Sequence, residues 1–173
     1  TAEVDRLTHR IDQVLSLART DSGSTVVQRM NASAKVAGRM AEAELIANEH
    51  EIELTGDITP DLWITSSEGT VAKITDELLG NAMSYARSRI HVTLRREGRD
   101  VVLSVSDDGP GLPETEREAV FQRFTRGSSA VPGGSGLGLA LVQESARAAG
   151  GDAKAVQSAL GGLEIRVSFP AAD

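Results

Sequence analysis

The sequence contains no cysteine, which excludes disulfides and thiolate metal sites and fits a reducing interior. Aromatic residues make up only 3% of the chain, so we expect its core to be aliphatic and rich in alanine. It has no apolar run of 18 or more residues and no signal peptide, so we expect the chain as given to be soluble. A formal net charge of −7 without any basic tract argues against a nucleic-acid partner.

The length of 173 residues, with 40% hydrophobic and 25% charged residues, is typical of one globular core with an appendage. Apolar residues spaced three and four apart over residues 4–18 predict a first helix. Its stripe fits a coiled-coil seam and an ordinary amphipathic helix equally well. The sequence Asp-Ser-Gly-Ser at residues 21–24 marks a junction, so we expect residues 1–23 to lie outside a compact body formed by residues 24–173.

The compact body is predicted to be α+β, a two-layer sandwich with helices on one face of a mixed, mostly antiparallel sheet. Asn31 is a candidate cap for a helix, and Trp63 is expected in the core. Two further helices are predicted over residues 67–85 and 138–149. Strands are predicted at residues 25–30, 51–54, 62–64, 89–95, 100–106 and 164–169, with a hairpin turn around Gly98.

A glycine-rich turn at residues 133–138 runs directly into the last predicted helix. Glycines let the backbone approach a ligand without a Cβ in the way, and unpaired N–H groups at a helix start favour an anion. The turn therefore predicts a phosphate-binding loop, although most surface turns of this composition bind nothing. No Lys follows the glycines as a Walker A loop requires, and Leu139 stands where a dinucleotide fingerprint needs Gly.

Polar residues recur on the helix predicted over residues 67–85. Glu77, Asn81 and Tyr85 are four residues apart and so share one face. A carboxylate and an amide oxygen on adjacent turns suit a Mg²⁺ ion that keeps several waters and meets a phosphate. The alternative is a solvated polar face with Tyr85 at its edge.

Two loops add further candidates. Residues 107–113 read Asp-Asp-Gly-Pro-Gly-Leu-Pro, so the carboxylate of Asp107 at a strand end can accept a hydrogen bond from an exocyclic amine. The alternative is an ordinary tight turn. Farther along, Phe121 and Phe124 are expected to pin a loop to the core, and Arg126 is free to reach a phosphate.

In this order, these four stretches resemble the N, G1, F and G2 boxes of the sensor histidine kinase ATP-binding domain, a GHKL superfamily domain, and the resemblance covers about residues 25–173. Residues 1–23 resemble the second helix of the dimerisation and phosphotransfer domain. The resemblance implies a Bergerat-type fold that binds ATP with Mg²⁺. It also implies transfer of the γ-phosphoryl to a histidine of that dimerisation domain, and from there to an aspartate of a response regulator receiver domain.

The resemblance also implies residue roles. Asn81 and Glu77 would meet the Mg²⁺ ion, Tyr85 would pack near the adenine, and Asp107 would accept from the adenine N6 amine. Arg126 would contact the γ-phosphate, at the start of a mobile lid over residues 126–133. The nucleotide-binding set is completed by Gly109, Gly111, Leu112, Gly134, Ser135, Gly136, Leu137, Gly138 and Leu139.

Two departures from the family pattern stand out. Glu77 occupies a position that is commonly Asn, so it is either a residue of the Mg²⁺ shell or a base that activates water, as in the related gyrase-type ATPases. His9 lacks the residues that follow a phosphoacceptor, and His50 and His91 lack them too. We therefore expect a fragment of a longer kinase that binds ATP but does not autophosphorylate alone. A hydrolytic ATPase, or an ATP-binding scaffold without catalysis, are the alternatives, and serine kinases of the anti-sigma type fit less well.

The expected setting follows from the same resemblance. We expect the chain to be a cytoplasmic domain, and the residues leave open whether its parent is anchored in the bacterial cell membrane. The parent is expected to be a homodimer.

Overall fold

The computed structural model describes residues 26–122 and 138–172. Three helices and two short 3-10 turns lie in these ranges: α2 (Ala32–Glu49), α3 (Glu68–Tyr85), η1 (Glu114–Glu116), η2 (Ala119–Phe121) and α4 (Gly138–Ala148). The strands are β1 (Gln28–Asn31), β2 (Glu53–Ile58), β3 (Trp63–Ser66), β4 (Arg89–Glu97), β5 (Asp100–Asp107), β6 (Asp152–Gln157) and β7 (Leu163–Pro170). The predicted helix over residues 4–18 lies outside the described residues.

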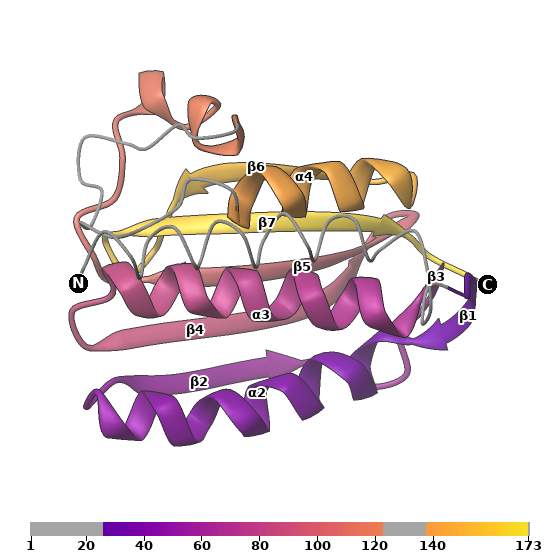
Figure 1. Cartoon of the computed structure of the whole chain (residues 1–173), viewed down its shortest axis with the longest axis horizontal. Helices are drawn as coiled ribbons and strands as arrows, with labels where there is room; N and C mark the ends of the chain where they lie inside the picture. The colour runs from indigo at the N-terminus through magenta and orange to yellow at the C-terminus, as the bar shows by residue number, and fades with distance from the viewer. Residues whose placement is uncertain (1–25, 123–137, 173) are drawn as a thin grey trace, which may run out of the picture.

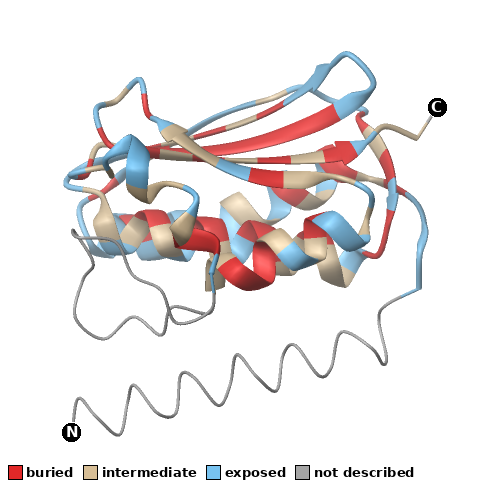
Figure 2. Cartoon of the chain, turned by 90° about the horizontal axis from the view of Figure 1, so that it is seen from above, coloured by how far each residue is buried: buried red, intermediate tan, exposed pale blue. Residues whose placement is uncertain are grey.

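Five strands form one sheet in the order β2-β4-β5-β7-β6. The β2–β4 pair is parallel and the other three pairs are antiparallel. The helices α2, α3 and α4 cover one face of this sheet (Figures 1 and 2). The predicted α+β sandwich, with its mixed and mostly antiparallel sheet, is therefore confirmed.

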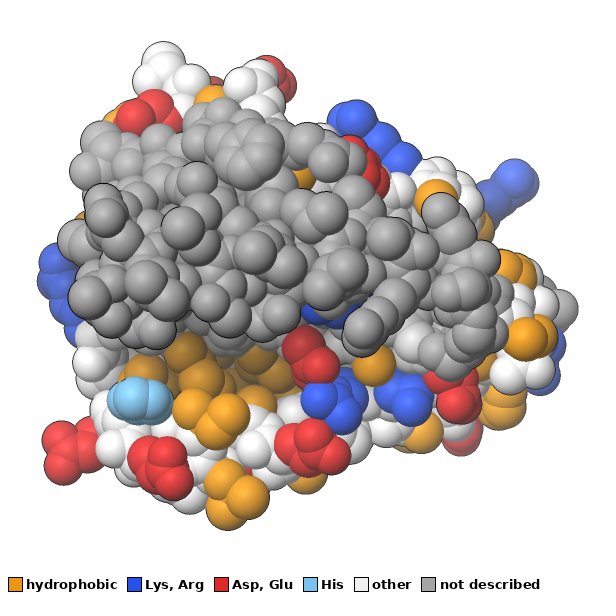
Figure 3. Space-filling view, viewed as in Figure 1, with side chains coloured by type: hydrophobic (Ala, Val, Ile, Leu, Met, Phe, Trp, Pro, Cys, Tyr) orange, Lys and Arg blue, Asp and Glu red, His pale blue; other side chains and the backbone are white. Residues whose placement is uncertain are grey.

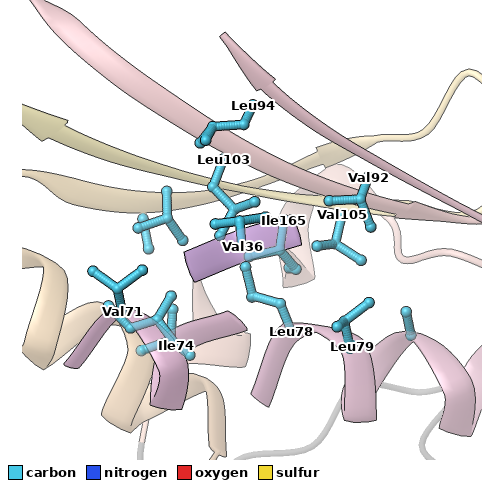
Figure 4. Close-up of a cluster of buried hydrophobic side chains, with 14 of the residues drawn as sticks. Val36, Val71, Ile74, Leu78, Leu79, Val92, Leu94, Leu103, Val105 and Ile165 are labelled. Atoms are coloured by element: carbon cyan, nitrogen blue, oxygen red, sulfur yellow. The ribbon is translucent and has the colours of Figure 1, made fainter. Parts of the chain in front are cut away.

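The core lies between the helices and the sheet. In β4, the buried residues Ile90, Val92 and Leu94 alternate with less buried neighbours because successive side chains of a strand point to opposite faces. The central strand β5 is buried at every position after Asp100. From α3, Val71, Ile74 and Leu78 project toward Val92 and Leu103 of the two strands (Figure 4). The core is aliphatic, as the scarcity of aromatic residues predicts.

The β4–β5 hairpin fixes the register of the central strands. Glu97 pairs with Asp100, and the two-residue turn between them contains Gly98 at φ 63°. This left-handed conformation favours glycine, so the turn sets the pairing along the whole hairpin. At the far end Ile90 pairs with Asp107, which places that carboxylate at the end of the central strand.

Ion pairs join α2 to α3 on the outer side of the helix layer. Arg39 donates from Nε and Nη2 to the two carboxylate oxygens of Asp76, each at 2.8 Å. Lys35 lies one helical turn before Arg39, and its Nζ is 3.8 Å from Oε2 of Glu68. Charged side chains of both signs lie side by side on this face (Figure 3). These groups are partly exposed, so they orient the two helices more than they stabilise them.

Two sequence expectations differ from the structure. Trp63 is only half-buried. The guanidinium of Arg29 stacks over its ring in a cation–π contact, with Cζ 4.4 Å from the ring centroid. Trp63 belongs to the small β1–β3 sheet and not to the main core. The second difference is β6, an edge strand that was not predicted. Among the described residues, no helix is both long enough and apolar enough to cross a bilayer.

Candidate functional site

The helix α3 carries three of the candidate residues. Its first turn is capped by Ser67, whose hydroxyl accepts from the Thr70 N–H at 3.0 Å. Its apolar residues face the sheet, so the polar stripe of Glu77, Asn81 and Tyr85 lies at the margin of the buried face. All three side chains are half-buried. The stripe predicted from spacing is therefore confirmed as geometry, and its role stays a prediction.

This polar stripe extends one turn farther toward the start of α3 than the spacing of the three candidate residues indicated. Lys73 lies four residues before Glu77, and its Nζ is 3.3 Å from Glu77 Oε1. The side chain of Glu77 is 19% exposed, so the pair is partly screened by solvent. Reasoning from sequence missed Lys73, although its helical spacing was a sufficient signal.

Asp107 is the most deeply buried ionisable side chain at this end of the sheet, with 2% of the residue exposed. Its Oδ1 accepts from the Gly109 N–H at 2.9 Å and from the Leu163 N–H at 3.2 Å. Burial raises the pKa of Asp107, and these two hydrogen bonds oppose that shift without cancelling it. Both bonds reach the same oxygen, so Oδ2 is the atom that can accept from a ligand.

The glycines around Asp107 permit close packing of one backbone on another. A Cβ at Gly109 would collide with the carbonyl of Tyr85, and a Cβ at Gly162 would collide with Oδ1 of Asp107. Gly111 has φ +68° and faces the carbonyl of Gly162. The space that Gly109 and Gly111 leave is thus filled by the chain itself, so these glycines shape the site by bringing its walls together.

Asp108 follows directly and has different surroundings. Its Oδ1 accepts from the backbone N–H groups of Arg87 at 2.8 Å, Ser88 at 3.0 Å and Arg89 at 3.1 Å. Its Oδ2 accepts from the Ser88 hydroxyl at 2.8 Å. Desolvation acts to raise the pKa of Asp108, but these bonds outweigh it and hold the pKa well below its ordinary range.

The remaining candidates divide into two groups. Gly138 begins α4, and Leu112 and Leu139 pack partly buried against the core cluster. Phe121 is buried in that cluster, as expected of a residue packed on the core, and the loop it was predicted to hold lies outside the described residues. Outside the described residues lie Phe124, Arg126, Gly134, Ser135, Gly136 and Leu137, together with the predicted lid over residues 126–133.

The described elements converge at one end of the molecule. The last turn of α3 and the end of β5 lie together at the left of Figure 1. From there the chain rises through η1 and η2, and α4 packs beside α3. Contact between Tyr85 and Gly109 joins the end of the helix to the turn after β5. The structure therefore brings Tyr85 and Asp107 to one region, as the motif order implies.

A family model described as "Histidine kinase-, DNA gyrase B-, and HSP90-like ATPase" matches residues 66–173. The chain belongs to this family. Within the histidine kinase-, gyrase- and HSP90-like ATPases, its relatives are sensor kinases. It is 43% identical over 98 residues to the sensor-type histidine kinase PrrB of Mycobacterium leprae, covering 55% of this chain and 22% of PrrB. It is 32% identical over 172 residues to a probable sensor histidine kinase of Mycobacterium tuberculosis, covering 97% of this chain and 44% of that protein.

Solved structures agree with this assignment to the ATPase family. The mycobacterial sensor histidine kinase MprB superposes with a TM-score of 0.75 at 25% identity, covering 83% of this chain and 98% of that one. Full-length ShkA in complex with AMPPNP superposes with a TM-score of 0.81 at 25% identity, covering 97% of this chain and 36% of ShkA. The chain is therefore the ATP-binding catalytic domain of a sensor histidine kinase. It spans between 22% and 44% of the length of these curated relatives.

Proposed function

We propose that this domain binds Mg-ATP at the end of β5 and α3 and presents its γ-phosphoryl group to a histidine of a dimerisation and phosphotransfer domain. The buried carboxylate of Asp107 is the observation that carries the proposal. It costs free energy to hold a carboxylate with 2% exposure, and one of its oxygens is left to accept from a ligand. A purine with an exocyclic amine supplies the missing donor.

Each residue has a proposed task in this site. Asp107 accepts from the adenine N6 amine, and Tyr85 packs beside the base. The amide oxygen of Asn81 holds the Mg²⁺ ion, with Glu77 in its shell. The glycine turn at residues 133–138 and Arg126 contact the phosphates. The full proposed contact set is Glu77, Asn81, Tyr85, Asp107, Gly109, Gly111, Leu112, Arg126, Gly134, Ser135, Gly136, Leu137, Gly138 and Leu139.

The residues present fit a phosphate-bound magnesium ion. No group of three or more His, Cys, Asp or Glu side chains gathers around a common point in the described part of the chain. An ion held by Asn81 would then draw most of its ligands from phosphate oxygens and water, which is how Mg²⁺ is usually bound beside nucleotides. The ion supplies neutralisation of phosphate charge, while the protein positions the nucleotide.

The phosphorelay is proposed for the longer protein of which this domain is part. Residues 1–23 are proposed as the second helix of the dimerisation domain, and residues 24–173 as the catalytic domain. The acceptor histidine would come from that dimerisation domain, in a homodimeric parent. The phosphoryl group would then pass to an aspartate of a response regulator receiver domain. A cytoplasmic location for this domain, in a parent anchored in the cell membrane, is part of the same proposal.

Titration calorimetry tests the nucleotide site. The unaltered chain should bind ATP in the presence of Mg²⁺, and Asn81→Asp and Asp107→Asn should each abolish measurable binding. Asn81→Asp brings a second negative charge to the phosphates, and Asp107→Asn replaces an ionised acceptor with an amide. Arg39→Ala, on the outer helix face, is the matched control and should bind normally. Unchanged affinity in both site variants would refute the assignment.

Hydrolysis of ATP by the isolated chain separates the two roles of Glu77. If Glu77 activates water, the chain turns over ATP steadily and Glu77→Ala removes the turnover. If Glu77 belongs to the magnesium shell of a kinase, turnover stays low in both proteins. We expect the second result, because Glu77 is already paired with Lys73.

A further inference from the structure

The turn after β5 contains a second carboxylate that the proposed nucleotide site does not use. Asp108 follows the base-recognition residue Asp107, yet its hydrogen bonds run to a different segment of the chain. That segment, residues 86–89, joins the end of α3 to the start of β4. Asp108 is therefore bonded to the connection that follows the helix bearing Asn81 and Tyr85.

The connection needs such a partner. The helix α3 ends at Tyr85, and the N–H of Ala86 still bonds within the helix, to the carbonyl of Ala82 at 2.7 Å. The next three N–H groups, of Arg87, Ser88 and Arg89, converge on Oδ1 of Asp108 at 2.8 to 3.1 Å. Backbone donors that leave a helix must find acceptors, so one carboxylate oxygen satisfies three successive groups.

Two other contacts tie the same two segments together. The backbone N–H of Asp108 donates to the carbonyl of Arg89 at 3.2 Å. Beside it, Gly109 lies against the carbonyl of Tyr85, at a separation that excludes any side chain. The end of α3 and the turn after β5 thus meet through backbone atoms on both sides of the Asp108 carboxylate.

We propose that Asp108 is a positioning residue for nucleobase recognition, because it holds the end of α3 against the turn after β5 and so sets Tyr85 relative to the carboxylate of Asp107. This inference rests on the proposed binding of ATP at Asp107. Asp108 touches no nucleotide in this arrangement. Its removal should therefore disturb the base contact more than the phosphate contacts.

The two oxygens of Asp108 give a sharp set of variants. Three backbone N–H groups donate to Oδ1, and the Ser88 N–H also lies 3.2 Å from Oδ2. Asp108→Asn therefore keeps the main acceptor, its amide can donate to the Ser88 hydroxyl, and it loses only the longer contact of the Ser88 N–H with Oδ2. Asp108→Ala removes every bond. Ser88→Ala removes only the hydroxyl contact and serves as the matched control. Asp108→Glu keeps the charge but moves it by one methylene group.

Calorimetric titration with Mg-ATP and with Mg-ITP tests the proposal, because inosine carries an oxygen in place of the adenine N6 amine. The unaltered chain should prefer ATP. Asp108→Ala should bind ATP about tenfold more weakly or worse and lose most of that preference, which is the usual scale for losing charge-assisted hydrogen bonds. The ATP affinity of Asp108→Asn should stay within about threefold of that of the unaltered chain, because this variant loses only the weak contact of the Ser88 N–H with Oδ2. Ser88→Ala should retain the preference for ATP.

Three results would overturn the proposal. One is a folded Asp108→Ala chain that keeps the ATP preference of the unaltered chain. Another is an Asp108→Asn chain as impaired as Asp108→Ala. If Asp108→Ala does not fold, Asp108→Glu decides, because a retained preference in that variant refutes the positioning role and a lost preference supports it. An unaltered chain that fails to bind ATP, or binds both nucleotides alike, instead refutes the proposed role of Asp107.

Discussion

At the scale of single residues, Asp107 and Asp108 show how the environment assigns opposite properties to identical side chains. Burial raises the pKa of Asp107, and dense hydrogen bonding lowers that of Asp108 despite some desolvation. The first carboxylate is left with an open acceptor oxygen. The second is fully engaged with backbone donors. Only the first is equipped to recognise a ligand.

The titration of Asp107 predicts opposite effects of pH on stability and on nucleotide affinity. Its folded pKa is raised above the ordinary value of 3.8, so its contribution to stability is fully present below pH 3.8 and is lost as the pH rises through the folded pKa. ATP affinity should change the other way, because Oδ1 already accepts two backbone bonds and a proton on Oδ2 would turn the acceptor proposed for the adenine amine into a donor.

Urea unfolding of the nucleotide-free chain and of Asp107→Asn, from pH 4 upward, measures the first effect. The unaltered chain should lose stability relative to the variant as the pH rises. A difference in unfolding free energy that stays constant with pH would contradict the assignment. Calorimetry of ATP binding over the same range measures the second effect, and affinity should fall as Asp107 becomes protonated.

At the scale of elements, the sequence predicted those parts whose pattern is long and regular. The helix α3 has an apolar stripe over five turns and a Ser cap, and the β4–β5 hairpin alternates on both sides of Gly98. Both were predicted within a few residues. The strand β6 was missed because Asp-Ala-Lys-Ala-Val-Gln is short, contains poor strand formers, and lies at the sheet edge with one side against solvent.

The candidate site was predicted only in part, for a related reason. Asn81 and Tyr85 follow from helical spacing, and Asp107 follows from its place between a strand and a glycine turn. The contribution of Leu163 and Gly162 depends on β7 pairing with β5, 56 positions away in the case of the Leu163–Asp107 bond. Local sequence pattern contains no information on such a contact.

The turn after β5 packs closely against the turn before β7, and this packing yields a prediction about stability. Gly162→Ala places a Cβ 2.6 Å from the N–H nitrogen of Gly109 and against the carboxylate of Asp107. We expect it to lower the free energy of unfolding by about 2 kcal/mol, typical of overpacking, and to weaken ATP binding. Chemical denaturation and calorimetry measure the two effects.

Gly38→Ala is the control for this prediction. A Cβ at Gly38 meets nothing within 4 Å, and the residue lies inside α2. This variant should raise the free energy of unfolding by about 0.5 to 1 kcal/mol, because alanine loses less backbone entropy in a helix. Equal destabilisation by Gly162→Ala and Gly38→Ala would show that close contact between the turn after β5 and the turn before β7 is not needed for stability.

At the scale of the whole molecule, the sheet is covered by helices on one face (Figure 2). Asp107 and Tyr85 of the proposed site lie where β5 and α3 end, at one end of that layer. Side chains on the uncovered face bond among themselves. Ser106 donates to Glu164 at 2.8 Å, and Arg166 pairs with Glu97 at 2.6 Å. Stability and binding are therefore concentrated in the same half of the domain, between sheet and helices.

This arrangement predicts that nucleotide stabilises the entire domain. A ligand that binds only the folded state adds about 2.7 kcal/mol at a free concentration one hundred times its dissociation constant. Thermal denaturation should show a higher Tm with Mg-ATP, a smaller rise with ATP and a chelator, and none for Asp107→Asn. An equal rise in that variant would mean that the nucleotide binds elsewhere.

The adjacency of the two aspartates has a consequence for how this loop can change over time. Consecutive residues of an extended strand project to opposite sides, so inserting or deleting one residue before position 107 would shift both carboxylates by one place. A deletion would bring Asp108 to the buried place of Asp107 and Gly109 to the place beside the connection after α3. An insertion would bring Asp107 to that second place and leave the buried place to the new residue. A substitution at either position removes one of the two carboxylates, whereas a change in the length of this loop would displace both from the groups they bond in a single event.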